Sequence, residues 1–192
     1  MGMPGQRIEE RRRGALVEAA IREVGDAGST DVTVARIARR AGVSSALAHH
    51  YFGTKEGILL AAMRRVLTLY AAEVRGALAM ARTPRERVRA ILVASLSPGS
   101  FRTETVAAWM AFYASAQHAP EAARLLAVYQ RRLESNLRHA LRPHPGAARA
   151  ARGAAAMIDG IYLREALGPA RRGAGEWTDL VMDCVERACP AS

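Results

Sequence analysis

Side chains that could hydrogen-bond to DNA are concentrated between residues 33 and 55, in the segment TVARIARRAGVSSALAHHYFGTK. This segment brings hydroxyl, imidazole, phenol and ammonium groups together within a short stretch of chain. Such groups donate to phosphate oxygens and can reach base edges in the major groove. The segment therefore predicts recognition of double-stranded DNA rather than bond-breaking chemistry.

The histidines and cysteines favour neither an enzyme nor a metalloprotein. No metal-ligand set and no Ser/His/Asp arrangement can be placed on the five histidines, which are His49, His50, His118, His139 and His144. We therefore predict no catalytic residue, no metal site and no cofactor. Cys184 and Cys189 are expected to be free thiols, the alternative being a disulfide that links two protomers.

The DNA-facing groups must be positioned by two helices and a tight turn. Thr33 can cap a first helix, with Val32 and Ile37 placed as a hydrophobic staple. Gly42 most easily adopts the left-handed conformation that ends a helix, and Ser44 can cap a second, short helix. Two helices joined by a short glycine-containing turn form the helix-turn-helix that reads DNA.

The rest of the chain also predicts helices. A long apolar pattern of helical period runs from Thr54 to about residue 81, and further helical segments are separated by breaks at 97–100, 143–146 and 168–169. No strand pattern and no repeat is present. We predict an all-α protein of about nine helices, with a three-helix head (residues 1–53) and a body (residues 54–192).

The charge balance is compatible with a polyanionic partner. Lys and Arg total 28 against 18 Asp and Glu, a formal net charge of +10. Residues 1–55 hold nine basic and six acidic side chains, so most of the excess lies outside the head. No apolar run reaches membrane-spanning length and no cleavable leader is visible, which predicts a cytoplasmic protein without a membrane partner.

The head resembles the tetracycline-repressor (TetR) family of DNA-binding repressors. The matching positions are Ala19-Ala20, Gly28, Thr33, Ile37-Ala38, Ala41-Gly42-Val43-Ser44, His50-Tyr51-Phe52 and Lys55-Glu56. The resemblance implies a homodimeric transcriptional repressor in which each head binds one half of an operator and the body binds a small-molecule effector. Half-sites are read in pairs, so a dimer is required mechanically.

The resemblance also assigns contacts within the second helix of the motif. It implies base-facing residues Ser45, Ala46, Leu47 and His49, and phosphate contacts by Thr33, Ser44, His50, Tyr51 and Lys55. Ala48 and Phe52 are expected in the core. The chain departs from the family at Ala48, which replaces a larger aliphatic residue, at His49, where Tyr is frequent, and at Gly53, where Lys is frequent. The last change removes one expected phosphate contact.

The body resembles one branch of this family, the choline-responsive repressors of glycine-betaine synthesis. The matching segments are AWMAFY at 108–113, His118 with Pro120, RRL at 131–133, SNL at 135–137 and IDGIYLR at 158–164. The resemblance implies control of betaine-synthesis genes and an effector that is choline or a related quaternary ammonium compound. Proteins hold such cations with aromatic faces, sometimes beside an anion.

The residues needed for such a site are present. Trp109, Phe112 and Tyr113 share one helix face, and Asp159 and Tyr162 are three residues apart on another. We predict that these five residues bind the effector, with Asp159 as the counter-charge. Ordinary helix packing is the alternative for the aromatic residues. Tyr113 and Tyr162 stand where the choline repressors often have Trp, which predicts a different affinity or a different ligand.

The predicted helices at 147–167 and 176–188 correspond to the pair that commonly forms the dimer bundle in this family. Small residues at Ala151, Ala155 and Gly160 would allow close approach between protomers. Two alternatives for the function stay open. One is a TetR-type repressor of an efflux or other metabolic operon with a different ligand. The other is a helical ligand-binding protein with a vestigial DNA head, which an operator-binding assay would distinguish.

Overall fold

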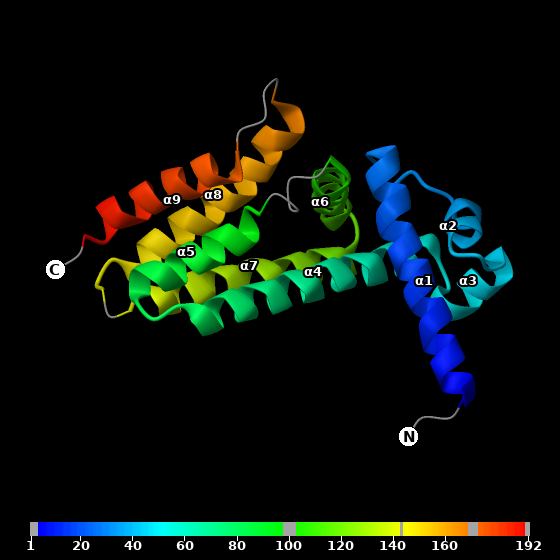
Figure 1. Ribbon diagram of the computed structural model, residues 1–192. Helices are drawn as coiled ribbons and strands as arrows, with labels where there is room; N and C mark the ends of the chain where they lie inside the picture. The colour runs from blue at the N-terminus through cyan, green and yellow to red at the C-terminus, as the bar shows by residue number, and fades with distance from the viewer. Residues whose placement is uncertain (1–3, 98–102, 143, 169–172, 191–192) are drawn as a thin grey trace.

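The computed structural model describes residues 4–97, 103–142, 144–168 and 173–190, and these residues form nine α-helices and no strand (Figure 1). The helices are α1 (Pro4–Ala27), α2 (Val34–Arg40), α3 (Ser45–Phe52), α4 (Lys55–Met80), α5 (Pro84–Ser95), α6 (Thr103–Ala116), α7 (Pro120–Ala140), α8 (Ala147–Leu167) and α9 (Ala174–Ala188). The predicted all-α class is confirmed. The predicted breaks at residues 98–100, 143 and 169 lie outside the described residues.

The head forms from the local signals that the sequence carries. The Thr33 hydroxyl accepts a hydrogen bond from the Arg36 N–H at 3.2 Å, and Ser44 does the same for the Leu47 N–H at 3.2 Å. Between the two caps, Gly42 has a φ of +68°, a value that favours glycine. These features fix the angle at which α3 leaves α2.

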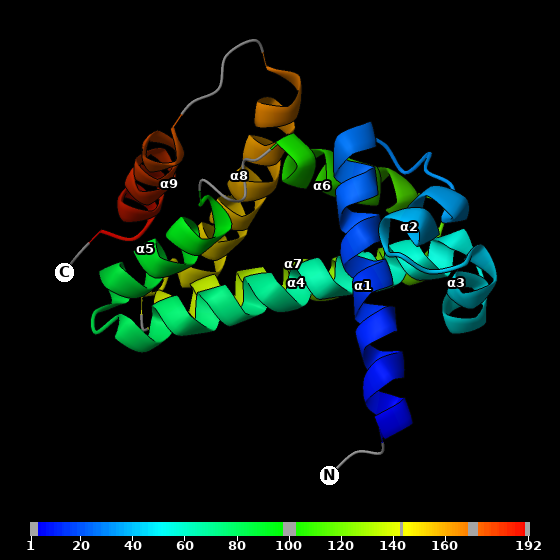
Figure 2. The same ribbon diagram turned by 45° about the vertical axis from the view of Figure 1, so that its right-hand side comes forward.

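Helix α4 joins the head to the body. It begins at Thr54, whose hydroxyl accepts from the Gly57 N–H at 3.1 Å, and it runs along the whole body (Figures 1 and 2). Figure 2 shows α1 crossing the first turns of α4, and α1 also packs on α6. The core beneath the head includes Ile58 of α4 and Ala111 of α6. The core of the head therefore continues past residue 54. The domain boundary between residues 53 and 54 stays a prediction about function.

In the body, α5 and α7 pack on α4, and α6, α8 and α9 pack on the other body helices. The core of the body contains fully buried side chains from four helices, among them Leu92, Leu133, Ile158 and Val181. Helix α8 lies between α7 and α9 and also contacts α6. This packing places the aromatic residues of α6 against the Asp159 region of α8. None of the described helices has the length and hydropathy to cross a membrane.

Candidate DNA interface and effector site

Helix α3 presents one polar face to solvent. Ser45, Ala46 and His49 are exposed, whereas Leu47 is half-buried and Ala48 is fully buried against the head core. The predicted packing role of Ala48 is confirmed. Three of the four residues expected to face bases are therefore accessible to a DNA major groove, and the fourth is accessible in part.

Two departures from the family pattern, His49 and Gly53, are in contact with each other. The Nδ1 atom of His49 lies 2.9 Å from the carbonyl oxygen of Gly53. A carbonyl oxygen only accepts hydrogen bonds, so Nδ1 carries the proton. Gly53 has a φ of +72°, which turns this carbonyl back toward α3. In the neutral ring, Nε2 is then left as a hydrogen-bond acceptor on the exposed face.

The residues expected to contact phosphates lie around this face. Thr33, Ser44 and His50 are exposed, and Tyr51 and Lys55 are half-buried. The Thr33 and Ser44 oxygens accept the capping bonds, which leaves each O–H available as a donor. Phe52, which the sequence places in the core, is half-buried and lies beneath the Arg13 guanidinium, whose central carbon is 4.8 Å from the ring centroid.

An ion-pair cluster that was not predicted from the sequence holds α2 against α1. The buried carboxylate of Glu23 is 2.9 Å from Arg36 and 2.6 Å from Arg40, and Arg40 also lies 2.6 Å from Asp26. The hydrogen bond to Asp26 and the two nearby carboxylates raise the pKa of Arg40. Glu23 stands three residues after Ala20, on the buried face of α1. A carboxylate at a position expected to be buried is the signal in the sequence that could have indicated an ion pair.

The predicted effector residues of α6 and α8 form one aromatic cluster centred on Trp109. Its ring centroid lies 6.1 Å from Phe112, 5.7 Å from Tyr113 and 5.8 Å from Tyr162. Tyr129 of α7, which was not predicted, is closer still at 5.0 Å. Trp109, Phe112, Tyr129 and Tyr162 are buried.

Asp159 lies at the edge of this cluster. The Tyr113 hydroxyl donates to Asp159 Oδ1 at 3.0 Å, and the amide of Gln130 donates to Oδ2 at 3.5 Å. Burial raises the pKa of Asp159, although both hydrogen bonds oppose this shift. Burial and the neighbouring carboxylate also raise the pKa of Tyr113, which therefore keeps its proton and acts as the donor.

A hydrogen-bond chain connects the cluster to α4. The Tyr162 hydroxyl donates to the carbonyl of Ser95 on α5. The Ser95 hydroxyl donates to the Ile91 carbonyl at 2.8 Å, and it accepts from the Tyr70 hydroxyl of α4 at 2.8 Å. Burial raises the pKa of Tyr70 to about 12, so this donor is protonated at neutral pH. Ser95 of α5 therefore links Tyr162 of α8 to Tyr70 of α4.

The rings are packed against one another in this structure. Trp109 is inclined by only 35° to Tyr113 and 31° to Tyr162, at centroid separations below 6 Å. A cation lies up to ~6 Å from the centroid of a ring that binds it. Two rings on opposite sides of one cation are therefore separated by about twice the cation–ring distance, which is more than the separations seen here. The cage and packing interpretations therefore describe two arrangements of the same rings. A cation held between two of these rings would require the cluster to open.

The described residues include no group of three or more His, Cys, Asp or Glu side chains that could hold a metal ion. Cys184 and Cys189 are partly exposed and unbonded within the protomer.

Sequence comparisons match both parts of the chain to known regulators. The profile of bacterial regulatory proteins of the tetR family matches residues 16–62, and the C-terminal profile of BetI-type transcriptional repressors matches residues 84–190. The chain is 48% identical over 186 residues to the HTH-type transcriptional regulator BetI of Brucella canis, which covers 95% of this chain and 94% of the relative. It is 52% identical over 168 residues to the regulator of the same name from Rhizobium meliloti, covering 86% and 83%.

Structural comparison gives the same fold. A transcriptional regulator from Saccharomonospora viridis in complex with choline superimposes with a TM-score of 0.81 at 24% identity, covering 91% of this chain and 95% of that one. A regulator from Pseudomonas aeruginosa PAO1 superimposes with a TM-score of 0.80, also at 24% identity, covering 93% and 90%. At this level of identity, the likeness shows the fold alone.

Proposed function

Since the chain belongs to the TetR family of bacterial regulators and to its BetI-type branch, we propose that the effector of this repressor is choline or a related quaternary ammonium compound. The protein is a ligand-responsive transcriptional repressor and not an enzyme. Operator binding requires a cytoplasmic location beside the DNA, which we propose together with control of betaine-synthesis genes.

One observation carries the proposal for the effector. Aromatic residues of α6 and α8, Trp109, Tyr113 and Tyr162, meet beside the half-buried carboxylate of Asp159. A trimethylammonium group cannot donate a hydrogen bond, so it depends on aromatic faces and a counter-charge. A titration of choline into the complex of repressor and operator tests the proposal. Release of the DNA by choline, but not by an uncharged analogue of similar shape, is the expected result.

The proposed switch runs through α4. A cation that separates the rings displaces Tyr162, and the Ser95 link passes the displacement to Tyr70 on α4. Because α4 begins directly after α3, its movement changes the spacing of the two recognition helices in a dimer. Effector and operator then oppose each other by the same coupling free energy, commonly ~1–3 kcal/mol.

We propose that the dimer forms through an exposed face of α8 and α9. Gly153, Ala156, Gly160, Leu163 and Leu167 follow each other at spacings of three and four residues on α8, and Leu180 is exposed on α9. The earlier expectation for Ala151 is wrong, because this residue is fully buried within the protomer. Ala155 is half-buried against the protomer core and is also a poor interface probe.

The fixed Nδ1–H of His49 leads to a prediction about base preference. Nε2 of the neutral ring accepts hydrogen bonds, and the donors in the major groove are adenine N6 and cytosine N4. We expect His49→Ala to lower the preference for adenine or cytosine at one operator position by roughly 2- to 10-fold, the equivalent of one hydrogen bond. Selection from a randomised operator library measures this preference. An unchanged preference would remove His49 from base recognition.

Lys55 is expected to contact a phosphate. Lys55→Ala should weaken binding to all operator sequences alike and lower the slope of log K against log[salt] by about 0.9, the value for one phosphate contact on duplex DNA. Binding measured over a series of salt concentrations tests this assignment, with the exposed Arg75→Ala on α4 as a control outside the head. A slope equal to that of the wild type would contradict it.

A further inference from the structure

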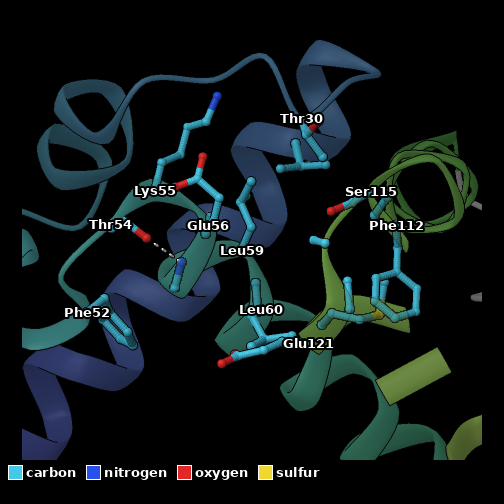
Figure 3. Close-up of a pocket in the computed structure, with 18 of the residues that line it drawn as sticks. Thr30, Phe52, Thr54, Lys55, Glu56, Leu59, Leu60, Phe112, Ser115 and Glu121 are labelled. Carbon is cyan, nitrogen blue, oxygen red and sulfur yellow. Dashed lines mark hydrogen bonds between the residues drawn. The ribbon is translucent and has the colours of Figure 1, made fainter. Parts of the chain in front are cut away.

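A cavity lies at the junction of the head and the body, apart from the Asp159 site. We call it the junction cavity; it has a volume of about 550 Å³. Figure 3 shows part of its wall. Its lining includes Ile21 and Val24 of α1, Leu59 and Met63 of α4, and Phe112 of α6. Phe112 is the one residue that it shares with the predicted effector residues.

The size and lining of the junction cavity suit a small organic molecule. Sites for such ligands are commonly ~300–1,000 Å³ and mostly apolar, with a few polar groups that fix orientation. Here the polar groups include Thr30 from the head side and Ser115 from the body side. In the view of Figure 3, Thr30 and Ser115 both lie to the right of Leu59. A ligand that fills the cavity therefore contacts both parts of the molecule.

The charged groups of the lining favour a cation. They are Lys55, Glu56 and Glu121, which carry one excess negative charge. Figure 3 shows Lys55 and Glu56 side by side at one end of the cavity and Glu121 at the other. The carboxylate of Glu121 thus remains without a neighbouring cation among the lining residues. An ammonium group placed beside Glu121 would leave an apolar body to lie against Leu59, Leu60 and Phe112.

We propose that the junction cavity is a second effector site, which binds an organic cation whose apolar body is larger than that of choline. The ligand packs against α1 and α4 on one side and α6 and α7 on the other. It stabilises the arrangement of head and body seen here over any arrangement that opens the cavity. Its binding therefore changes operator affinity, because ligand and DNA both depend on the position of the head.

The test uses three probes that share one apolar body: 4-phenylbutylamine, 4-phenylbutanol and 4-phenylbutyrate. Calorimetric titration into the full chain should give the highest affinity for the amine, a lower affinity for the alcohol and the lowest for the carboxylate. Glu121→Gln should weaken the amine by about two- to fivefold, as expected for an exposed ion pair, and leave the alcohol unchanged. The control Glu73→Gln removes an exposed carboxylate of α4 outside the cavity and should change neither.

A second variant tests the location. Ser115→Trp fills the cavity and should abolish binding of all three probes while choline binding is retained. Circular dichroism confirms that the variant is folded. Glu121 is exposed, so the first variant remains informative even if Ser115→Trp misfolds. Equal binding of amine and alcohol by the wild type, or full binding of the amine by folded Ser115→Trp, would overturn the proposal.

The regulatory part has its own measurement. Saturating 4-phenylbutylamine, with choline absent, should change the operator Kd by about fivefold or more. An unchanged Kd would overturn the coupling between the cavity and the DNA. Because choline is titrated separately, failure of the junction site is distinguishable from failure of the choline proposal.

Discussion

Leu163→Glu is expected to yield a folded monomer that no longer shifts operator DNA at concentrations that saturate the wild type. Leu163 is 50% exposed on α8, and Leu167 on the same face is 76% exposed, which is unusual for leucine. In a two-fold symmetric dimer one surface patch meets itself, so each substitution appears twice. Two carboxylates would then be buried against apolar and like-charged neighbours, at a cost of several kcal/mol.

The loss of operator affinity should be large because a dimer binds two half-sites at once. Specific operators are bound with Kd values of about 10⁻⁸–10⁻¹¹ M. A monomer that keeps one half of this free energy would bind at least ~10⁴-fold more weakly. Light scattering gives the oligomeric state and an electrophoretic shift gives the affinity. The matched control is Leu69→Glu on α4, where the leucine is 48% exposed and outside the proposed face. A dimeric Leu163→Glu protein would place the interface elsewhere.

Local signals in the sequence predicted the head well. Thr33 and Ser44 each cap the helix that follows, and Gly42 has the positive φ that its turn requires. Each of these features depends on contacts within four residues. Composition and spacing are sufficient to predict such contacts.

Contacts between distant segments were not predictable in the same way. Tyr129 joins the cluster around Trp109 because α7 packs beside α6, and no spacing in the sequence relates the two residues. The ion pairs of Glu23 with Arg36 and Arg40 depend on the angle between α1 and α2.

Ala151 shows a related ambiguity. Small residues occur on both faces of α8, and only the packed structure shows that Ala151 faces inward while Ala156 faces solvent. Composition alone therefore could not separate the core face of this helix from the proposed dimer face.

The cluster geometry also decides which variant can test the effector site. Trp109 is buried and touches four other rings, so Trp109→Ala should cost about 3–5 kcal/mol of stability through the cavity it leaves. A loss of choline binding by that variant would not separate cation recognition from packing. Asp159→Asn keeps the shape of the side chain, removes its charge and replaces the oxygen that accepts from Gln130 by an NH2 group. The Asn oxygen can still accept from the Tyr113 hydroxyl.

We expect Asp159→Asn to weaken choline binding by about 5- to 150-fold, equivalent to ~1–3 kcal/mol for a partly buried charge pair, and to spare an uncharged analogue of similar shape. The unliganded variant should melt at a higher temperature than the wild type at neutral pH. Burial raises the pKa of Asp159 in the folded state, so the folded protein holds this proton more tightly than the unfolded chain. Ionisation of Asp159 therefore lowers stability as the pH rises past the unfolded pKa, and Asn removes that cost.

The raised pKa of Asp159 also sets the pH dependence of choline binding. Protonation of Asp159 competes with the cation, so the affinity of the wild type should fall as the pH is lowered. The fall should begin at a higher pH than it would for an exposed aspartate, because burial raises this pKa. Asp159→Asn should lack this pH dependence. Calorimetric titrations of both proteins over a pH series, with melting curves in the presence and absence of choline, measure the two effects together. Equal choline affinities for wild type and variant would show that Asp159 is not the counter-charge.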